Sequence, residues 1–379
     1  MQVAIQWEIY ELTNSAFHLG FIGLIMFIPV IMGTFIIGYV ADHYDRRRVI
    51  LICQLSKALG ALILLVAGYT GLLSVSLIYF VVFIVGIGRA FEGPTLHTIP
   101  PSVVPQHVLS RAIAAGATAH QVAVIGGPAL GGFLLAAETN AVYYVCFAMF
   151  VVAGICISLV KIQRSAKVKK AVTLESVFAG FHYIRSRPVI FGAISLDLAA
   201  VLVGGVTALL PIFARDVLDA GPWGLGLLRS SPAVGALLLS FYLSNIQIDK
   251  HAGRIMIGAV VIYGLALVGF GFSSWLWFSM LMLAITGGAD SVSVVVRHSL
   301  VQARTPNDML GRVMAVNSTF TGTTTHLGQF ESGVVAALIG AAPAAIVGGL
   351  GAAVAAVLWI KLFPDFWRVQ SVVRTNESS

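Results

Sequence analysis

Between two long apolar runs lies the stretch Gly38-Tyr39-Val40-Ala41-Asp42-His43-Tyr44-Asp45-Arg46-Arg47-Arg48, which gathers five Asp and Arg side chains. The apolar run before it extends from about Ala16 to Ala41, and the run after it extends from Val49 to Tyr69. Each run is long enough to cross a bilayer, since a membrane-spanning helix needs about 20 residues. The stretch therefore predicts a tight cytoplasmic loop between two membrane-spanning helices.

The composition of the whole chain supports this interpretation. The chain has 379 residues, of which 58% are hydrophobic and only 10% are charged, so it lacks the polar residues that a soluble protein needs at its surface. We predict an all-α integral membrane protein. Eleven complete spans are expected, at 18–41, 49–69, 73–97, 112–136, 140–160, 188–213, 222–244, 254–272, 275–302, 312–338 and 341–362.

The beginning of the chain differs from these spans. Met1 to Thr13 is apolar and aromatic, but as a helix it would reach only about 20 Å. We expect it to be the outer half of a truncated first helix, in a twelve-helix design with two halves of six. The expected parts are an N-terminal bundle (1–160), a basic cytoplasmic linker (161–187) with an amphipathic helix at Thr173–Arg185, and a C-terminal bundle with a short cytoplasmic tail (188–379).

The positive charge of the chain is placed asymmetrically. The net charge is +7, and 18 of the 23 lysines and arginines fall on the predicted cytoplasmic side. One, Arg215, falls on the other side, and Lys57, Arg89, Arg229 and Arg297 fall within spans. Because lysine and arginine accumulate on the cytoplasmic side of membrane proteins, topology explains the basic composition without a nucleic-acid partner.

Charged and polar groups inside spans are candidates for function, since they are costly in a bilayer. The candidates for binding a proton are Asp197, Glu92, Asp290 and Glu331, although a structural pair is an open alternative for each. Glu8 and Glu11 are interpreted as charges at the outer rim. The span 312–338 is the most polar, so it should line a pore or the seam between halves; the candidates for the pore or seam are Arg229, Arg297, Asn317, His326 and Gln329.

The two halves repeat at a constant spacing. An offset of 201 residues places Pro105 on Pro306, Gly127 on Gly328 and Gly132 on Gly333. The same order and spacing indicate a parallel repeat, which is one of the architectures of secondary transporters. The offset also places Arg89 on Asp290, but no direct salt bridge is predicted from this correspondence.

Three motifs resemble those of the major facilitator superfamily. Gly38-x-x-x-Asp42-x-x-x-Arg46-Arg47, with Arg48 beside it, resembles the loop G-x-x-x-D-R-x-G-R-R, with His43 and Asp45 as departures. Arg89-x-x-x-Gly93 is similar to the helix-4 motif, and Gly127-Pro128-x-x-Gly131-Gly132 to the helix-5 motif of antiporters. Asp45 to Arg48, Gly311 to Asn317 and Gly328 to Gly333 resemble the bacterial enterobactin-exporter-like branch.

The resemblance implies alternating access between two halves. In this mechanism Asp42 would accept hydrogen bonds from amides near Gly311 at the start of a later helix, where the helix dipole favours an anion by about 0.3–1 kcal/mol. Such a contact would hold the cytoplasmic side closed in the outward-facing state. An alternative to this gating role is that Arg46 to Arg48 only set the topology of the chain. For the helix-5 motif, two roles remain open: close packing of helices and a hinge.

We therefore predict a secondary transporter that uses protons to export an amphiphilic small molecule, such as a siderophore or a drug-like compound, from a bacterium through its inner membrane. The expected partners are the substrate, protons and the lipid bilayer, and the chain is expected to act as a monomer without cofactor, metal or catalytic residues. Uptake of a nutrient and movement of a lipid are alternatives on the same fold. A membrane enzyme is a third alternative. It is disfavoured because the sequence has no nucleophile elbow, His-rich cluster or P-loop.

Overall fold

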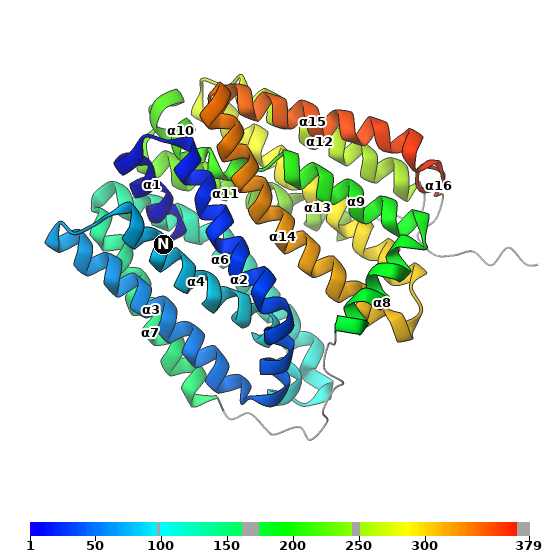
Figure 1. The fold of residues 1–379 in the computed structure, drawn as a ribbon, viewed down its shortest axis with the longest axis horizontal. Coiled ribbons are helices and arrows are strands. Elements are labelled where there is room, and N and C mark those ends of the chain that lie inside the picture. Colours follow the sequence, from blue (N-terminus) through cyan, green and yellow to red (C-terminus); the bar gives the residue numbers. More distant parts are fainter. Residues whose placement is uncertain (97–98, 161–173, 245–250, 370–379) are drawn as a thin grey trace, which may run out of the picture.

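The computed structural model describes residues 1–96, 99–160, 174–244 and 251–369, and within these ranges it leaves out the side chains at 34–39, 41–43, 174–177, 244, 307 and 308. Every regular element in the described ranges is helical, which confirms the predicted all-α fold (Figure 1). The N-terminal half consists of α1 (Gln2–Thr13), α2 (Ala16–His43), α3 (Arg46–Thr70), α4 (Val75–Leu96), α5 (Pro100–Val103), α6 (Gln106–Ala137) and α7 (Thr139–Leu159).

The rest of the described chain forms the C-terminal half. Its elements are α8 (Leu174–Arg185), α9 (Pro188–Val203), the 3-10 turn η1 (Val206–Ala208), α10 (Leu210–Ile212), the π turn η2 (Phe213–Val217), α11 (Gly221–Ser244), α12 (Ala252–Gly271), α13 (Leu276–Arg304), α14 (Asn307–Ile339), α15 (Ala341–Leu362) and α16 (Pro364–Trp367). Ten helical segments among the described residues are long and apolar enough to cross a membrane. The predicted span at 312–338 is α14, which has 33 residues but is too polar to be one of those ten.

One predicted span is not a continuous helix. The segment predicted at 188–213 ends as α9 at Val203 and continues through short 3-10, α and π turns to Val217. The break lies at Gly204 and Gly205, where the chain passes very close to α14: a Cβ on Gly205 would stand 2.3 Å from the carbonyl of Gly328. Only glycine permits this approach of two backbones, and the bend follows from it.

The starts of the helices agree with the predicted repeat. α4 and α13 begin 201 residues apart, as do α6 and α14. The halves meet through two equivalent helix pairs, α2 with α14 and α6 with α11, and Figure 1 shows α14 (orange) lying alongside α2 (blue). A pair of glycines lies at each crossing, Gly20 against Gly333 and Gly132 against Gly226. Small residues at both crossings allow close backbone contact, as is common between membrane helices.

The two halves contact one another in their outer and middle parts, where the outer part is the one far from the loop Gly38–Arg48. Arg215 Nη2 donates to Asn14 Oδ1 at 2.7 Å, and Ser230 Oγ donates to the carbonyl of Ile125 at 2.7 Å. In contrast, the inner part of α6, from Gln106 to His120, has no buried residue. A helix that packs against the other half keeps buried residues on the packed face. Because this part of α6 has none, the two halves are separated at their cytoplasmic ends. The arrangement is therefore closed on the outer side of the membrane and open on the cytoplasmic side.

The predicted amphipathic helix is present as α8, which packs against α14 and α9. Gly180 faces the backbone of Arg312, Phe181 stacks on Phe320 with 6.2 Å between ring centres, and Ile184 is buried. The helix is therefore attached to the inner part of the C-terminal half. The basic residues of the linker between 161 and 173 lie outside the described residues.

Candidate functional site: buried polar networks and the seam between halves

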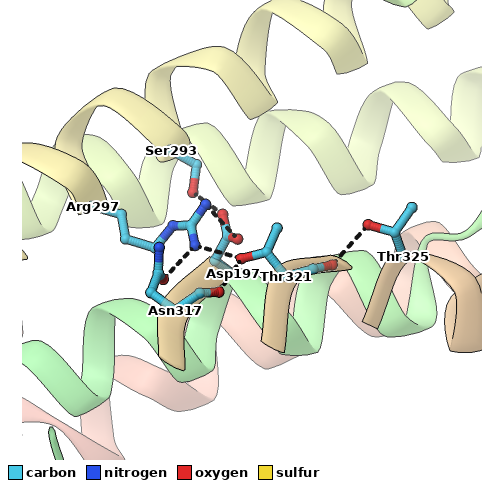
Figure 2. Close-up of polar contacts among 6 residues, drawn as sticks. All are labelled: Asp197, Ser293, Arg297, Asn317, Thr321 and Thr325. Atoms are coloured by element: carbon cyan, nitrogen blue, oxygen red, sulfur yellow. Dashed lines mark hydrogen bonds and ion pairs between the residues drawn. The ribbon is translucent and has the colours of Figure 1, made fainter. Parts of the chain in front are cut away.

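A buried ion pair lies at the centre of the C-terminal half (Figure 2). Arg297 Nη2 on α13 stands 3.3 Å from Asp197 Oδ2 on α9, and the two residues are only 1% and 3% exposed. Ser293 Oγ donates to Asp197 Oδ1 at 3.0 Å. An isolated charge at this depth would be strongly unfavourable, so each ion depends on the other and on its hydrogen bonds.

The same arginine reaches a third helix. Arg297 Nη1 donates to Asn317 Oδ1 at 2.7 Å and to Thr321 Oγ1 at 2.9 Å, both on α14. Thr321 and Thr325 in turn donate to the backbone carbonyl four residues before them. Helical spacing places Ser293 and Arg297 on one face of α13, and Asn317 and Thr321 on one face of α14. The network therefore links α9, α13 and α14 through a single guanidinium (Figure 2).

A small cavity lies beside this network. It has a volume of about 10 Å³, which is near the lower limit for one water molecule, and it is lined by Asp197, Asp290, Tyr263 and Ser293 among others. Tyr263 Oη donates to the carbonyl of Gly204 at 3.0 Å, at the break that follows α9. Two predicted proton-binding candidates thus share one polar cavity.

The N-terminal half holds a different pair. Lys57 Nζ on α3 stands 2.6 Å from Glu92 Oε2 on α4, and Gln54 Nε2 donates to Glu92 Oε1 at 2.8 Å. Lys57 also lies over the ring of Phe150, 4.9 Å from its centre. Glu92, predicted as a proton-binding candidate, is therefore held by a partner that the sequence did not indicate.

Three nitrogen-bearing side chains from the two halves interact electrostatically near the seam. Arg89 on α4 lies within electrostatic range of Arg229 on α11 and of His326 on α14. Arg229 donates through Nη2 to Gln2 Oε1 at 3.1 Å and through Nη1 to Gln6 Oε1, both on α1. Arg89 and Asp290, which the repeat aligns, have no ion pair with each other among the described residues.

The remaining seam candidates lie on α14. Gln329 stands where α2 crosses, since a Cβ on Gly23 would lie 2.9 Å from its Cβ. Glu331 is half-buried and accepts a hydrogen bond from Ser332 at 3.3 Å. Neither side chain belongs to the Asp197–Arg297 network.

The loop motif is described only in part. The side chains at 38 and 42, and with them the predicted latch of Asp42, lie outside the described residues. Asp45 begins α3: its Oδ1 accepts the backbone N–H of Arg47 at 3.0 Å. This departure from the superfamily pattern therefore serves as a helix N-cap. Arg46 and Arg47 are half-buried, Arg48 is exposed, and a Cβ on Gly311 would meet open space.

The helix-5 motif divides into two parts. Gly132 packs against Gly226, and Gly226 also faces the carbonyl of Pro128, whereas Gly131 only approaches Val3. A Cβ on Gly127 would meet open space. Close packing, one of the two alternatives, thus accounts for Gly132 and Pro128 but not for Gly127. Arg89 and Gly93 of the helix-4 motif both lie on exposed positions of α4.

Glu8 was interpreted as a rim charge, and this interpretation is wrong. Glu8 is 5% exposed and accepts a hydrogen bond from the hydroxyl of Tyr143 on α7. It is buried because α1 contacts α2, α4 and α6 of its own half and α10 and α11 of the other. Across the described ranges no group of His, Cys, Asp and Glu gathers that could hold a metal ion.

Comparison with known proteins gives consistent matches. A family model described as transmembrane secretion effector matches residues 1–373. Macrolide efflux protein A of Streptococcus pyogenes is 23% identical over 347 residues, covering 90% of this chain and 86% of that protein. Enterobactin exporter EntS of Citrobacter koseri is 24% identical over 375 residues, covering 97% of this chain and 88% of that protein.

Solved structures show the same fold. The nucleoside transporter NupG superposes with a TM-score of 0.72 at 14% identity, covering 96% of both chains. A bacterial homologue of the human lysosomal transporter Spinster, solved in an inward-facing and unoccupied conformation, superposes with a TM-score of 0.64 at 14% identity, covering 97% of this chain and 92% of that one.

Proposed function

Because the chain belongs to the transmembrane secretion effector family of the major facilitator superfamily, and is thus a multi-pass membrane transporter and not an enzyme, we propose that it exports an amphiphilic small molecule in exchange for protons. The two relatives are described as efflux proteins for a macrolide and for enterobactin, which supports export as the direction.

The observation that carries proton coupling is the buried pair of Asp197 and Arg297. When Asp197 takes up a proton, Arg297 loses its counter-charge and keeps its hydrogen bonds to Asn317 and Thr321 of α14. Asp290 shares the adjoining cavity, and a water molecule there could pass a proton between the two carboxylates. Protonation at this site therefore changes how α14 is held against α9 and α13.

The position of α14 makes this change relevant to transport. The inner and middle parts of α14 carry Asn317 and Thr321, whereas its outer part crosses α2 of the other half at Gly333. A proton on Asp197 can thus alter the contact between the halves, although Asp197 does not lie at that contact. Glu92 is a weaker candidate, because its partners Lys57 and Gln54 belong to its own half.

The opposite state of the cycle requires closure at the inner side. We propose that Asp42 then accepts hydrogen bonds from the amides near Gly311, with Arg46 to Arg48 beside it. The open surroundings of Gly311 in the present arrangement leave room for such a contact. We also propose that the protein acts as a monomer in the cytoplasmic membrane of a bacterium, since the seam is formed by two halves of one chain.

Flux measurements in membrane vesicles test the proposed function. Everted vesicles that contain the chain are acidified inside, and accumulation of enterobactin and of a macrolide is followed. Export predicts accumulation of a transported compound that stops when the proton gradient is collapsed, and vesicles from the same host without the chain serve as the control. Accumulation only in right-side-out vesicles would support uptake, and movement of a labelled phospholipid instead would support a lipid mover.

A further inference from the structure

A concentration of positive charge lies at the seam and is not used by the proton-binding network. Arg89 comes from the N-terminal half, and Arg229 and His326 come from the C-terminal half. Neither arginine forms an ion pair with a carboxylate in the part of the chain that the structure describes, and their mutual interaction is repulsive. Two unpaired guanidinium groups in a membrane protein are unfavourable unless water or an anion reaches them.

The carboxylate near these groups does not balance them. Glu92 lies one turn from Arg89 and interacts with it, but Glu92 is bound directly by Lys57. Two arginines and a lysine are therefore set against one carboxylate. The excess of positive charge favours an anion at this level of the seam.

Neighbouring side chains orient Arg229 toward this role. Gln2 and Gln6 accept hydrogen bonds from its two terminal nitrogens and thereby fix the plane of the guanidinium. His326 Nδ1 is buried and has no hydrogen-bond partner in the described part of the chain. A ring nitrogen without a partner can bind a ligand oxygen when it carries a proton.

Open space lies one helical turn from Arg89 and from His326. Gly93 lies one helical turn from Arg89 on the same face of α4, and Gly322 lies one turn from His326 on the same face of α14. A Cβ built on either glycine would meet no atom within 4 Å. The surroundings can therefore accommodate a ligand body larger than a simple ion.

We propose that Arg89 and Arg229 bind an oxyanion of an amphiphilic substrate, such as a carboxylate or an ionised phenol, with His326 as an additional contact. This inference rests on the proposed transport function and names its substrate class. The ligand joins one arginine from each half, so its binding favours an arrangement in which the halves lie close together. A planar guanidinium suits this task because it can donate two parallel hydrogen bonds to one oxyanion.

Three probes of matched shape test the proposal on the purified full-length chain: 2-naphthoate, 2-naphthamide and 2-naphthylmethylammonium. Binding is measured by calorimetry in detergent without a proton gradient. We expect naphthoate to bind about tenfold or more tightly than either other probe, since a hydrogen bond to a charged group is stronger than one to a neutral group. Equal affinities, or no binding of any probe, would overturn the proposal.

Two variants locate the binding. Arg89→Gln and Arg229→Gln should each weaken naphthoate binding about tenfold or more and leave naphthamide unchanged. Arg111→Gln, an exposed change on α6, is the control and should have no effect. Arg89 is itself exposed, so its variant gives an answer even if Arg229→Gln does not fold. If the chain binds naphthoate selectively but shows no proton-driven flux, only the proposed function is contradicted. If it shows proton-driven flux but no charge-selective binding, only this inference is contradicted.

Discussion

Gly333 of α14 and Gly20 of α2 lie so close that a Cβ on Gly333 would stand 2.4 Å from the Cα of Gly20. Gly132 and Gly226 form the equivalent contact at the other crossing, where a Cβ on Gly132 would stand 2.6 Å from the Cα of Gly226. The closed outer side thus depends on two contacts that tolerate no side chain. This dependence can be tested without knowledge of the substrate.

Gly333→Ala should shift the protein toward the outward-open arrangement. The added methyl group overpacks only the closed outer contact, at a cost of about 1–3 kcal/mol, so the ratio of the open to the closed state rises by about fivefold or more. The measurement is the rate at which an impermeant maleimide labels a reporter Ser15→Cys at the outer start of α2 in a cysteine-free background. Gly322→Ala, whose Cβ meets open space, is the control. Equal labelling rates in both variants would contradict this role of the crossing.

Asp197→Asn should destabilise the protein by about 3–5 kcal/mol, because it leaves the buried Arg297 without a counter-charge. The double variant Asp197→Asn/Arg297→Met should recover most of this loss, since it removes both ions. Thermal unfolding in detergent measures the effect, with the exposed change Asp365→Asn as the control. A single variant as stable as the parent chain would show that the pair is not stabilising.

Glu92→Gln should lower stability but preserve proton-driven flux. The change leaves Lys57, whose side chain is 8% exposed, without its carboxylate, while the Asp197 network is untouched. Lys57→Met/Glu92→Leu should recover stability in the same unfolding experiment. Loss of gradient-driven accumulation in a folded Glu92→Gln variant would instead assign the proton to Glu92.

Asp42→Asn should reduce transport and shift the population further toward the inward-open arrangement, because the proposed inner contact with the start of α14 is weakened. A reporter Thr118→Cys on the exposed inner part of α6 should then label faster. Asp45→Asn is the matched control in the same loop, since asparagine caps a helix about as well as aspartate. Unchanged labelling in Asp42→Asn would refute the latch.

Much of the fold follows from the sequence because a membrane helix is defined by the length of its apolar run. Each of the eleven predicted spans overlaps a described helical segment, with ends that differ by one or two residues in several cases and a break in the span at 188–213. The polarity of the span at 312–338 agrees with the contact of α14 with α2 of the other half. The starts of α6 and α14 agree with the offset between the two halves. These features depend on local composition and spacing alone.

The partners of the charged groups were less predictable, because they depend on how distant helices pack. Lys57 and Glu92 are 35 residues apart, and only the contact between α3 and α4 brings them together. Glu8 is buried because α1 lies between the halves, which its position near the start of the chain did not indicate. By contrast, Ser293 and Thr321 could have been found, since each lies four residues from a candidate on the same helix.

The most direct test of proton coupling at Asp197 compares two kinds of flux in one variant, using a compound that the vesicle assay shows to be transported. Asp197→Asn/Arg297→Met should still exchange labelled for unlabelled compound across the membrane, because the pathway between the halves is retained. It should not accumulate the compound under an imposed proton gradient, because the site that binds the proton is gone. Gradient-driven accumulation by this variant at the parent rate would contradict the account.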